Sequence, residues 1–138
     1  MKEEFVINDV SDEEGAMTRR ILIVDDEEAL LIALKKLLNE KQVDIDTAET
    51  LEGATKLIGD TEYDIVIADI RLAGVLNQDG LEILQYVKKH SPDTRVVLMT
   101  GYGSPEIMEY AFSLGADFYF EKPVSIKVLK DAIRSLKP

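Results

Sequence analysis

Short apolar runs alternate along this chain with longer segments in which apolar residues recur every three or four positions. The runs begin near Ile21, Val43, Ile65, Val96 and Phe118, and their length is typical of buried strands. The helical spacing appears between them in Leu30, Ala33, Leu34 and Leu37, in Leu51, Ala54 and Ile58, and in Leu81, Leu84 and Val87. Strict alternation of strand and helix predicts an α/β fold, a doubly wound five-stranded parallel sheet with helices on both faces.

Residues that favour helix ends stand at the predicted boundaries. Ser, Thr and a following Pro are preferred where helices begin, and Gly is preferred just past their ends. The expected caps and stops are Thr50 and Gly59 for the second helix, Ser104-Pro105 and Gly115 for the fourth, and Ser125 for the last.

The composition of the 138-residue chain fits one domain, since 46% of its residues are hydrophobic and can cover a core. It has no cysteine, which is compatible with a reducing compartment. No apolar run approaches the ~18 residues that a membrane span needs. We therefore expect a cytoplasmic protein with no membrane partner.

The formal net charge of -11 argues against direct nucleic-acid binding, which depends on clustered Lys and Arg. The charge is uneven, because residues 1–18 hold six acids against one lysine and so carry -5 of it. We expect an acidic extension over 1–18 and the folded domain over 19–137. The apolar cluster 5–7 leaves open that the extension docks on a partner or a second copy.

Polar residues follow four of the five predicted strands. Asp25 and Asp26 follow the first strand, Asp69 the third, Thr100 the fourth and Lys122 the fifth. The carboxyl ends of parallel strands meet at one edge of a sheet, where open α/β folds bind ligands. Three carboxylates packed together repel one another, and a hard divalent cation such as Mg²⁺ would relieve that repulsion.

The residue types at this edge suit phosphoryl transfer. A carboxylate is a poor nucleophile, so attack on phosphorus depends on positioning and on neutralising the charge of the transferring oxygens. Mg²⁺ and the ammonium group of Lys122 would supply positive charge, the Thr100 hydroxyl could donate a hydrogen bond, and Gly101 leaves room for the phosphoryl group. These residues predict a magnesium-assisted, phosphoryl-accepting aspartate at Asp69.

Five stretches of the chain resemble the receiver domain of response regulators in two-component signalling. They are Ile21-Leu22-Ile23-Val24-Asp25-Asp26-Glu27, Asp64-Ile65-Val66-Ile67-Ala68-Asp69, Asp79-Gly80-Leu81-Glu82, Met99-Thr100-Gly101-Tyr102-Gly103 and Gly115-Ala116-Asp117-Phe118-Tyr119-Phe120-Glu121-Lys122-Pro123. The resemblance covers about residues 19 to 137. It implies a flavodoxin-like (βα)5 fold with strand order 2-1-3-4-5 and a phosphorylation-controlled switch that is not an enzyme acting on a separate substrate.

The resemblance also implies how the acidic residues act. Asp69 would accept a phosphoryl group from a phosphohistidine of a sensor histidine kinase or histidine phosphotransfer protein. Asp26, Asp69 and the backbone carbonyl of Arg71 would bind Mg²⁺ directly, and Asp25 would act mainly through a bound water. Lys122 would contact the phosphoryl group.

Thr100 and Tyr119 are the positions that the resemblance assigns to reporting phosphorylation, by movement of the hydroxyl and repacking of the ring. The peptide bond between Lys122 and Pro123 would be cis, as in the family. The fourth predicted helix would form an output or homodimer surface with the last strand and helix. Its buried face needs only Ile107, Ala111 and Leu114, yet it also carries Met108, Tyr110 and Phe112, which could instead pack against neighbouring elements.

The segment 70–78 departs from the family, in which a shorter loop containing Pro follows the phosphoryl-accepting strand. We hypothesise that this longer loop alters partner choice or phosphoryl lifetime, and that Arg71 and Tyr102 influence how easily water reaches the site. The sequence does not identify the partner kinase or the output.

Other interpretations of these residues are weaker. Asp25 and Asp26 could simply cap the first helix. A phosphatase that forms an aspartyl-phosphate would carry a second Asp two residues after its nucleophile, where this chain has Arg71. A flavin-binding carrier would need a loop rich in Ser, Thr and Gly after the first strand, where this chain is acidic. His90 ends a predicted helix, where a structural role fits best.

Overall fold

One sheet of five parallel strands forms the centre of the molecule in a computed structural model, which describes residues 18–72 and 78–136. The strands are β1 (Arg19–Val24), β2 (Val43–Ala48), β3 (Ile65–Asp69), β4 (Arg95–Thr100) and β5 (Phe118–Glu121). Their order across the sheet is β2-β1-β3-β4-β5, and all neighbouring pairs run parallel. The predicted fold class and strand order are therefore confirmed.

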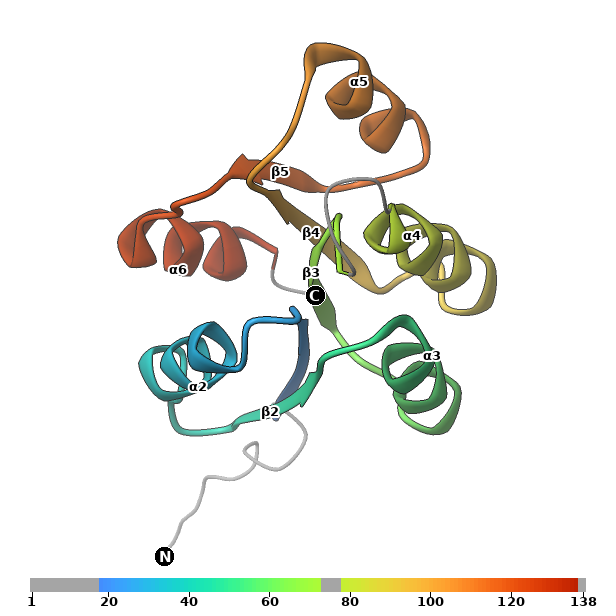
Figure 1. Ribbon diagram of the computed structural model, residues 1–138. Helices are drawn as coiled ribbons and strands as arrows, with labels where there is room; N and C mark the ends of the chain where they lie inside the picture. The colour runs from blue at the N-terminus through green and yellow to red at the C-terminus, as the bar shows by residue number, and fades with distance from the viewer. Residues whose placement is uncertain (1–17, 73–77, 137–138) are drawn as a thin grey trace, which may run out of the picture.

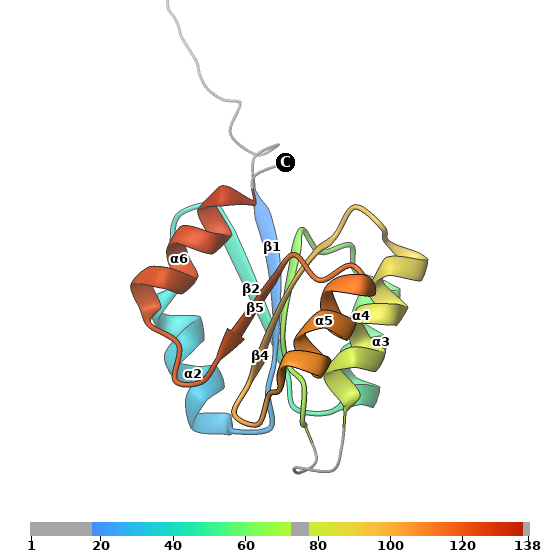
Figure 2. The same cartoon turned by 90° about the horizontal axis from the view of Figure 1, so that it is seen from above.

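Five helices cover the two faces of this sheet (Figures 1 and 2). They are α2 (Glu28–Leu37), α3 (Leu51–Asp60), α4 (Asp79–His90), α5 (Pro105–Ser113) and α6 (Ile126–Ser135). Figure 2 shows α2 and α6 on one side of the sheet and α3, α4 and α5 on the other. The order of the strands reverses between β1 and β3, which makes their carboxyl ends the switch point of the fold.

The core is two clusters, one on each face of the sheet, because successive side chains of a strand point to opposite faces. Ile21 and Ile23 of β1 pack with α2 and α6, whereas Leu22 and Val24 pack with the helices of the opposite face. All four side chains are at most 1% exposed. Burial on both faces explains why β1 and β3 are continuous apolar runs.

Most of the predicted helix ends are confirmed. The side chains of Thr50, Ser104 and Ser125 each accept a hydrogen bond from a backbone N–H in the first turn of α3, α5 and α6. Gly115 follows α5 with φ +107°, a conformation that other residues rarely adopt. The prediction for Gly59 is wrong: α3 continues to Asp60 and the chain leaves it in an extended conformation, which does not require glycine.

The buried face of α2 differs from the spacing seen in the sequence. Leu31, Leu34 and Leu38 are buried, whereas Ala33 is exposed and Leu37 is 46% exposed. This segment is apolar at more positions than one helix stripe can bury, so the spacing fits two rotations of the helix. Contact with β1 and β2 selects the rotation that includes Leu31.

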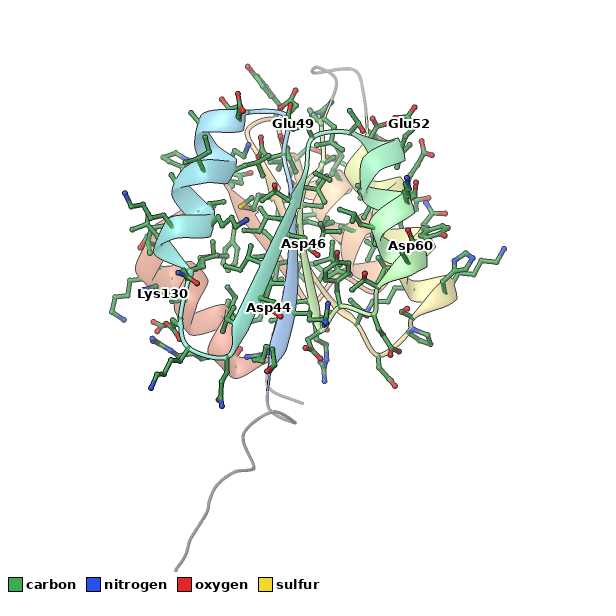
Figure 3. The ribbon with its side chains drawn as sticks, turned by 90° about the horizontal axis from the view of Figure 1, so that it is seen from below. Asp44, Asp46, Glu49, Glu52, Asp60 and Lys130 are labelled. Atoms are coloured by element: carbon green, nitrogen blue, oxygen red, sulfur yellow. The ribbon has the colours of Figure 1, made fainter. Side chains whose placement is uncertain are left out.

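The β2 edge of the sheet carries exposed acids (Figure 3). Asp44 and Asp46 lie along the strand, and Asp46 accepts a 2.6 Å hydrogen bond from the Tyr63 hydroxyl. Charged side chains on an edge strand discourage pairing with a further strand. The acidic extension, apart from residue 18, and the middle of the loop 70–78 fall outside the described residues.

Candidate functional site

The ends of β1 and β3 bring three carboxylates together. Val24 pairs with Ala68 in the sheet, so the residues that follow them, Asp25 and Asp69, lie side by side. One carboxylate oxygen from each of Asp25, Asp26 and Asp69 lies within 4.8 Å of the others. Asp25 is fully buried and Asp69 is 6% exposed, whereas Asp26 is open to solvent.

Lys122 reaches this cluster from the end of β5. Thr100 pairs with Glu121, so Lys122 stands just past the same edge of the sheet. Its Nζ donates to Asp25 Oδ2 at 2.7 Å and to Asp69 Oδ2 at 3.2 Å. The Lys122–Pro123 peptide bond is cis. One ammonium group therefore bridges two of the three acids, and the cluster as a whole stays negative.

Burial and mutual repulsion shift the protonation of these groups. Burial, together with the charge of Asp25, raises the pKa of Asp26 above its ordinary value. Burial also raises the pKa of Asp69, and the Arg71 backbone N–H and Lys122 only partly oppose it. Burial lowers the pKa of Lys122, but bonding to Asp25 and the charges of Asp25 and Asp69 outweigh it and leave that pKa raised. The site thus holds ionised acids at a free-energy cost.

The donor set fits a hard divalent cation. Three carboxylates at these distances offer only oxygen ligands, which Mg²⁺ and Ca²⁺ prefer over the nitrogen and sulfur ligands of zinc sites. A bound cation would offset the repulsion from Asp25, which after burial is the next cause of the raised pKa of Asp26. The pocket above the acids is open on one side and is lined by Asp26, Glu27, Asp69, Arg71, Gly101, Tyr102 and Lys122.

Thr100 lies at the end of β4, in the register position after Met99, which pairs with Asp69. Its side chain is buried, and its Oγ1 accepts a 3.1 Å hydrogen bond from the Tyr102 backbone N–H. Gly101 lines the pocket, and nothing lies within 4 Å of the position a Cβ would take there. Gly101 and Lys122 therefore line the same pocket as Asp69, and Thr100 is buried at the end of the neighbouring strand.

Tyr119 lies under the turn between β4 and α5. Its hydroxyl is buried and makes no hydrogen bond by distance and angle within 18–72 and 78–136. The ring lies against Phe112 with centroids 6.4 Å apart, and a Cβ on Gly103 would collide with the hydroxyl. Burial and the charge of Glu121 raise the pKa of this hydroxyl, more than Ser104 and Arg71 lower it.

Arg71 joins two loops of the site. Its backbone N–H donates to Asp69 Oδ1 at 3.1 Å. Its guanidinium group donates to the backbone carbonyl of Tyr102 through Nε at 3.1 Å and through Nη2 at 2.9 Å. The residue therefore ties the segment after β3 to the segment after β4, directly above the pocket.

Gly80 is a site residue that residue-type reasoning did not single out. A Cβ at this position would collide with the backbone carbonyl of Asp69, and the Gly80 N–H donates to the Ile70 carbonyl at 2.9 Å. The start of α4 therefore packs directly on the backbone of the central acid. The sequence signal here was the stretch Asp79-Gly80-Leu81-Glu82, which resembles the receiver domain without assigning a role to the glycine.

The alternative interpretations can be compared with these contacts. The residue that caps α2 is Glu27, whose side chain makes no capping hydrogen bond, while Asp25 Oδ1 accepts from the Glu27 N–H at 2.9 Å. Asp25 is thus committed to Lys122 and to the turn before the helix. His90 lies at the end of α4, where its ring stacks on Tyr86 with centroids 4.0 Å apart.

The outer face of α5 is exposed. Met108 is 39% exposed, Phe112 46% and Tyr110 50%, while Ile107, Ala111 and Leu114 face the core. Phe112 also packs against a neighbouring strand, since its ring centroid lies 6.4 Å from that of Tyr119 in β5. No helix among residues 18–72 and 78–136 is long and apolar enough to cross a membrane.

Comparison with known proteins identifies one family. A family model described as response regulator receiver domain matches residues 21–134. Sporulation initiation phosphotransferase F of Bacillus subtilis is 31% identical over 122 residues, which are 88% of this chain and 96% of that protein. Some curated relatives are longer: this chain spans 61% of the photosynthetic apparatus regulatory protein RegA of Rhodobacter capsulatus and 21% of an NtrX-like protein of Rickettsia bellii. It spans 95% of the chemotaxis protein CheY of Halobacterium salinarum, which is 30% identical.

Solved structures show the same architecture. The beryllofluoride-activated NtrC4 receiver domain dimer superposes with a TM-score of 0.76 at 31% identity, over 86% of this chain and 95% of that one. A response regulator from Burkholderia pseudomallei, solved with a phosphorylated aspartic acid, a calcium ion and citrate, gives a TM-score of 0.75 at 25% identity, over 83% of this chain and 65% of that one.

Proposed function

This chain belongs to the response regulator receiver domain family, and we propose that Asp69 is the residue through which it is switched. The chain is a signalling domain of two-component phosphotransfer and not an enzyme acting on a separate substrate. The observation that carries the assignment of Asp69 is that it lines the pocket, lies beside the other two acids and accepts a hydrogen bond from Lys122. Asp25 is buried against Lys122 and Asp26 stands at the rim, so Asp69 is the acid aimed at an incoming phosphoryl group.

The reaction is a transfer between a phosphohistidine and a carboxylate. An Asp69 oxygen bonds to phosphorus, the P–N bond breaks, and its electron pair returns to the imidazole of the donor. Lys122 and the backbone N–H of Arg71 hold the Asp69 carboxylate in one orientation before the reaction. Positioning of this kind supplies much of the barrier reduction in phosphoryl transfer, because little covalent chemistry is left to the protein.

We assign the cation as Mg²⁺, held by Asp26, Asp69 and the backbone carbonyl of Arg71, with Asp25 acting mainly through a bound water. When bound, it neutralises charge on the phosphoryl oxygens and on the acids that surround them. Lys122, Thr100 and Gly101 contact the phosphoryl group. The open pocket admits water as well as the donor, which agrees with a phosphoryl group that is later hydrolysed.

The output surface is the face of α5, β5 and α6. Thr100 and Tyr119 report phosphorylation: the hydroxyl moves to the phosphoryl group and the tyrosine ring repacks. Tyr119 contacts Phe112 on the exposed face of α5, which supports a route from the site to that face. The shift is between two populated arrangements biased by one new charged group.

The partners follow from this chemistry. The phosphoryl donor is a histidine kinase or a histidine phosphotransfer protein, and the switched face forms a homodimer, as the NtrC4 receiver domain dimer suggests. The receiver domain spans 19–137 and follows an acidic extension over 1–18. A cytoplasmic location fits a donor that is charged from ATP, and the net charge of -11 disfavours direct nucleic-acid contact by this chain.

Incubation with acetyl phosphate and Mg²⁺, followed by intact-mass measurement, tests the assignment. The wild-type protein should gain the mass of one phosphoryl group, and Asp69→Asn should gain none. Asp44→Asn, which removes one exposed acid from β2 outside the pocket, is the matched control and should be modified like the wild type. Modification of Asp69→Asn at the wild-type level would remove Asp69 from the acceptor role.

A further inference from the structure

The backbone N–H and the backbone carbonyl of residue 102 are each held by a side chain close to Asp69. The Tyr102 N–H donates to Thr100 Oγ1 at 3.1 Å, and the Tyr102 carbonyl accepts two hydrogen bonds from the Arg71 guanidinium group. The Tyr102 side chain takes no part in either contact and is 64% exposed. The turn between β4 and α5 is therefore fixed through one peptide segment.

Both groups that hold this segment stand at strand ends close to Asp69, and one of them, Arg71, lines the pocket above it. Thr100 ends β4 beside β3, and Arg71 lies two residues after Asp69 and lines the same pocket. The Arg71 backbone N–H is already bonded to Asp69 Oδ1, so its side chain starts next to any group attached to that carboxylate. A phosphoryl group on Asp69 would stand among Arg71, Thr100 and Lys122.

The Tyr102 carbonyl and a phosphoryl group differ in charge as acceptors for the Arg71 guanidinium group. The Tyr102 carbonyl is neutral, whereas a phosphoryl group carries two negative charges near neutral pH. Both bonds have a charged donor, but only the phosphoryl group adds opposite charge on the acceptor, and the planar guanidinium group suits two oxygens of one phosphoryl group. The phosphoryl group is therefore the stronger competitor for Arg71.

We propose that Arg71 is a further phosphoryl-contacting residue, and that phosphorylation of Asp69 moves its guanidinium group from the Tyr102 carbonyl to the phosphoryl oxygens. The inference rests on Asp69 being the phosphoryl acceptor. Thr100 Oγ1 leaves the Tyr102 N–H in the same event, since its hydroxyl turns to the phosphoryl group. Residue 102 then loses both of its restraints together.

The released turn has two direct neighbours that can pass the change on. Gly103 lies against the Tyr119 hydroxyl, and Ser104 caps α5 through its hydrogen bond from the Ile107 N–H. Movement of the turn therefore changes both the space available to Tyr119 and the start of α5. Arg71 acts here as a link between the acid and the turn, in addition to Thr100.

Nuclear magnetic resonance of the full chain tests the exchange of partners. The Tyr102 carbonyl carbon and the Arg71 Nε–H are recorded with Mg²⁺, before and after beryllofluoride is added as a phosphoryl analogue. Both signals should shift together on addition. Saturation of the site by beryllofluoride with both signals unchanged would overturn the proposal.

Affinity for beryllofluoride separates phosphoryl contact from a merely structural role. Arg71→Gln should bind beryllofluoride about tenfold more weakly than the wild type, because it loses a charge-assisted contact. Arg71→Lys keeps the charge without the planar fork and should fall between the two. Arg134→Gln, which removes an exposed arginine of α6, is the control and should match the wild type. Unchanged affinity in Arg71→Gln would refute the proposal and leave Arg71 with only a structural role in the turn.

The same samples separate failure of Asp69 as the phosphoryl acceptor from failure of Arg71 as a phosphoryl contact. If acetyl phosphate modifies Asp69 but Arg71 and Tyr102 do not respond, the proposed function stands and this inference fails. If Asp69 is not modified in the wild type, both fall. Folding of each variant is checked by its amide spectrum, so that loss of binding is not confused with loss of structure.

Discussion

Replacing Asp26 with Asn should make the metal-free protein more stable, although it removes a residue of the proposed site. Asp26 and Asp25 hold carboxylate oxygens within 4.8 Å of each other, and the repulsion between them contributes to the raised pKa of Asp26. Asparagine has the same shape without the charge. The substitution therefore removes a repulsive interaction and leaves the packing of the loop unchanged.

The size of the effect follows from Coulomb's law and the exposure of Asp26. Two unit charges 4.8 Å apart repel by about 3.5 kcal/mol at an effective dielectric constant of 20 and by about 0.9 kcal/mol in bulk water. Asp26 is open to solvent, so the lower value applies. We expect Asp26→Asn to raise the free energy of unfolding by about 1 kcal/mol, or the melting temperature by about 3 °C.

Mg²⁺ should make the wild type more stable than Asp26→Asn, which reverses the order of stability expected without metal. A ligand at a hundred times its dissociation constant stabilises the folded state by about 2.7 kcal/mol, provided that it binds only that state. Wild-type protein should gain this amount on titration with Mg²⁺, whereas Asp26→Asn should gain little because it lacks one proposed ligand. Urea unfolding followed by circular dichroism, first with a chelator and then with Mg²⁺, measures both quantities.

Lowering the pH tests whether the charge of Asp26 causes the stability difference between the wild type and Asp26→Asn. The pKa of Asp26 is raised in the folded state, so the folded protein holds the proton more tightly than the unfolded chain does. The cost of the ionised group is complete above the folded pKa and disappears as the pH falls from there to below the ordinary value of 3.8. The advantage of Asp26→Asn should shrink over that window.

The matched control is Asp44→Asn, which removes the same single charge from an exposed position on β2. It should change stability by no more than about 0.5 kcal/mol and keep the response to Mg²⁺. The reasoning is refuted if Asp26→Asn is less stable than wild type in chelator, or if it gains as much from Mg²⁺.

Four further substitutions probe the surroundings of Asp69. Lys122→Met should slow phosphorylation by acetyl phosphate and lower the free energy of unfolding by about 2 kcal/mol, because it leaves buried carboxylates without their cation. Mass measurement would show the first effect and urea unfolding the second. Unchanged stability would contradict the prediction. Gly80→Ala should cost about 2 kcal/mol, since its Cβ meets the Asp69 carbonyl, whereas Gly101→Ala, with open space at its Cβ, should change stability little. Tyr119→Phe removes a buried hydroxyl that has no hydrogen bond in the described part of the chain and should stabilise the protein by about 1 kcal/mol in thermal unfolding; a loss of 1 kcal/mol would indicate a polar partner.

The fold was predictable from sequence because two independent signals agree in it. Apolar runs such as 65–68 predicted strands buried on both faces, and residues such as Thr50 and Ser104 marked where helices begin. Each signal depends on local chemistry that the folded chain preserves. The strand order, in contrast, came from resemblance to a family, since alternation alone does not say which strands are neighbours.

The predictions from sequence were wrong where a segment was compatible with two structures. The helix α2 has apolar residues on more than one stripe, and only contact with the sheet places Leu31 inside and Leu37 outside. Gly59 is compatible with a helix end but also tolerable inside a helix, and α3 takes in one further residue. A glycine decides a boundary only where the backbone needs a positive φ, as at Gly115.

Some contacts of the site can be predicted from residue types, whereas contacts made to the backbone cannot. Acids and a lysine at strand ends predict a contact between them, because opposite charges at one edge of a sheet have few other partners. The structure shows this contact as the bridge from Lys122 to Asp25 and Asp69. The bond from Arg71 to the Tyr102 carbonyl has no such signal, since any residue at 102 presents the same carbonyl. A link of this kind needs an arginine side chain on one loop and only the backbone of the other. It therefore requires a particular residue at position 71 but not at position 102.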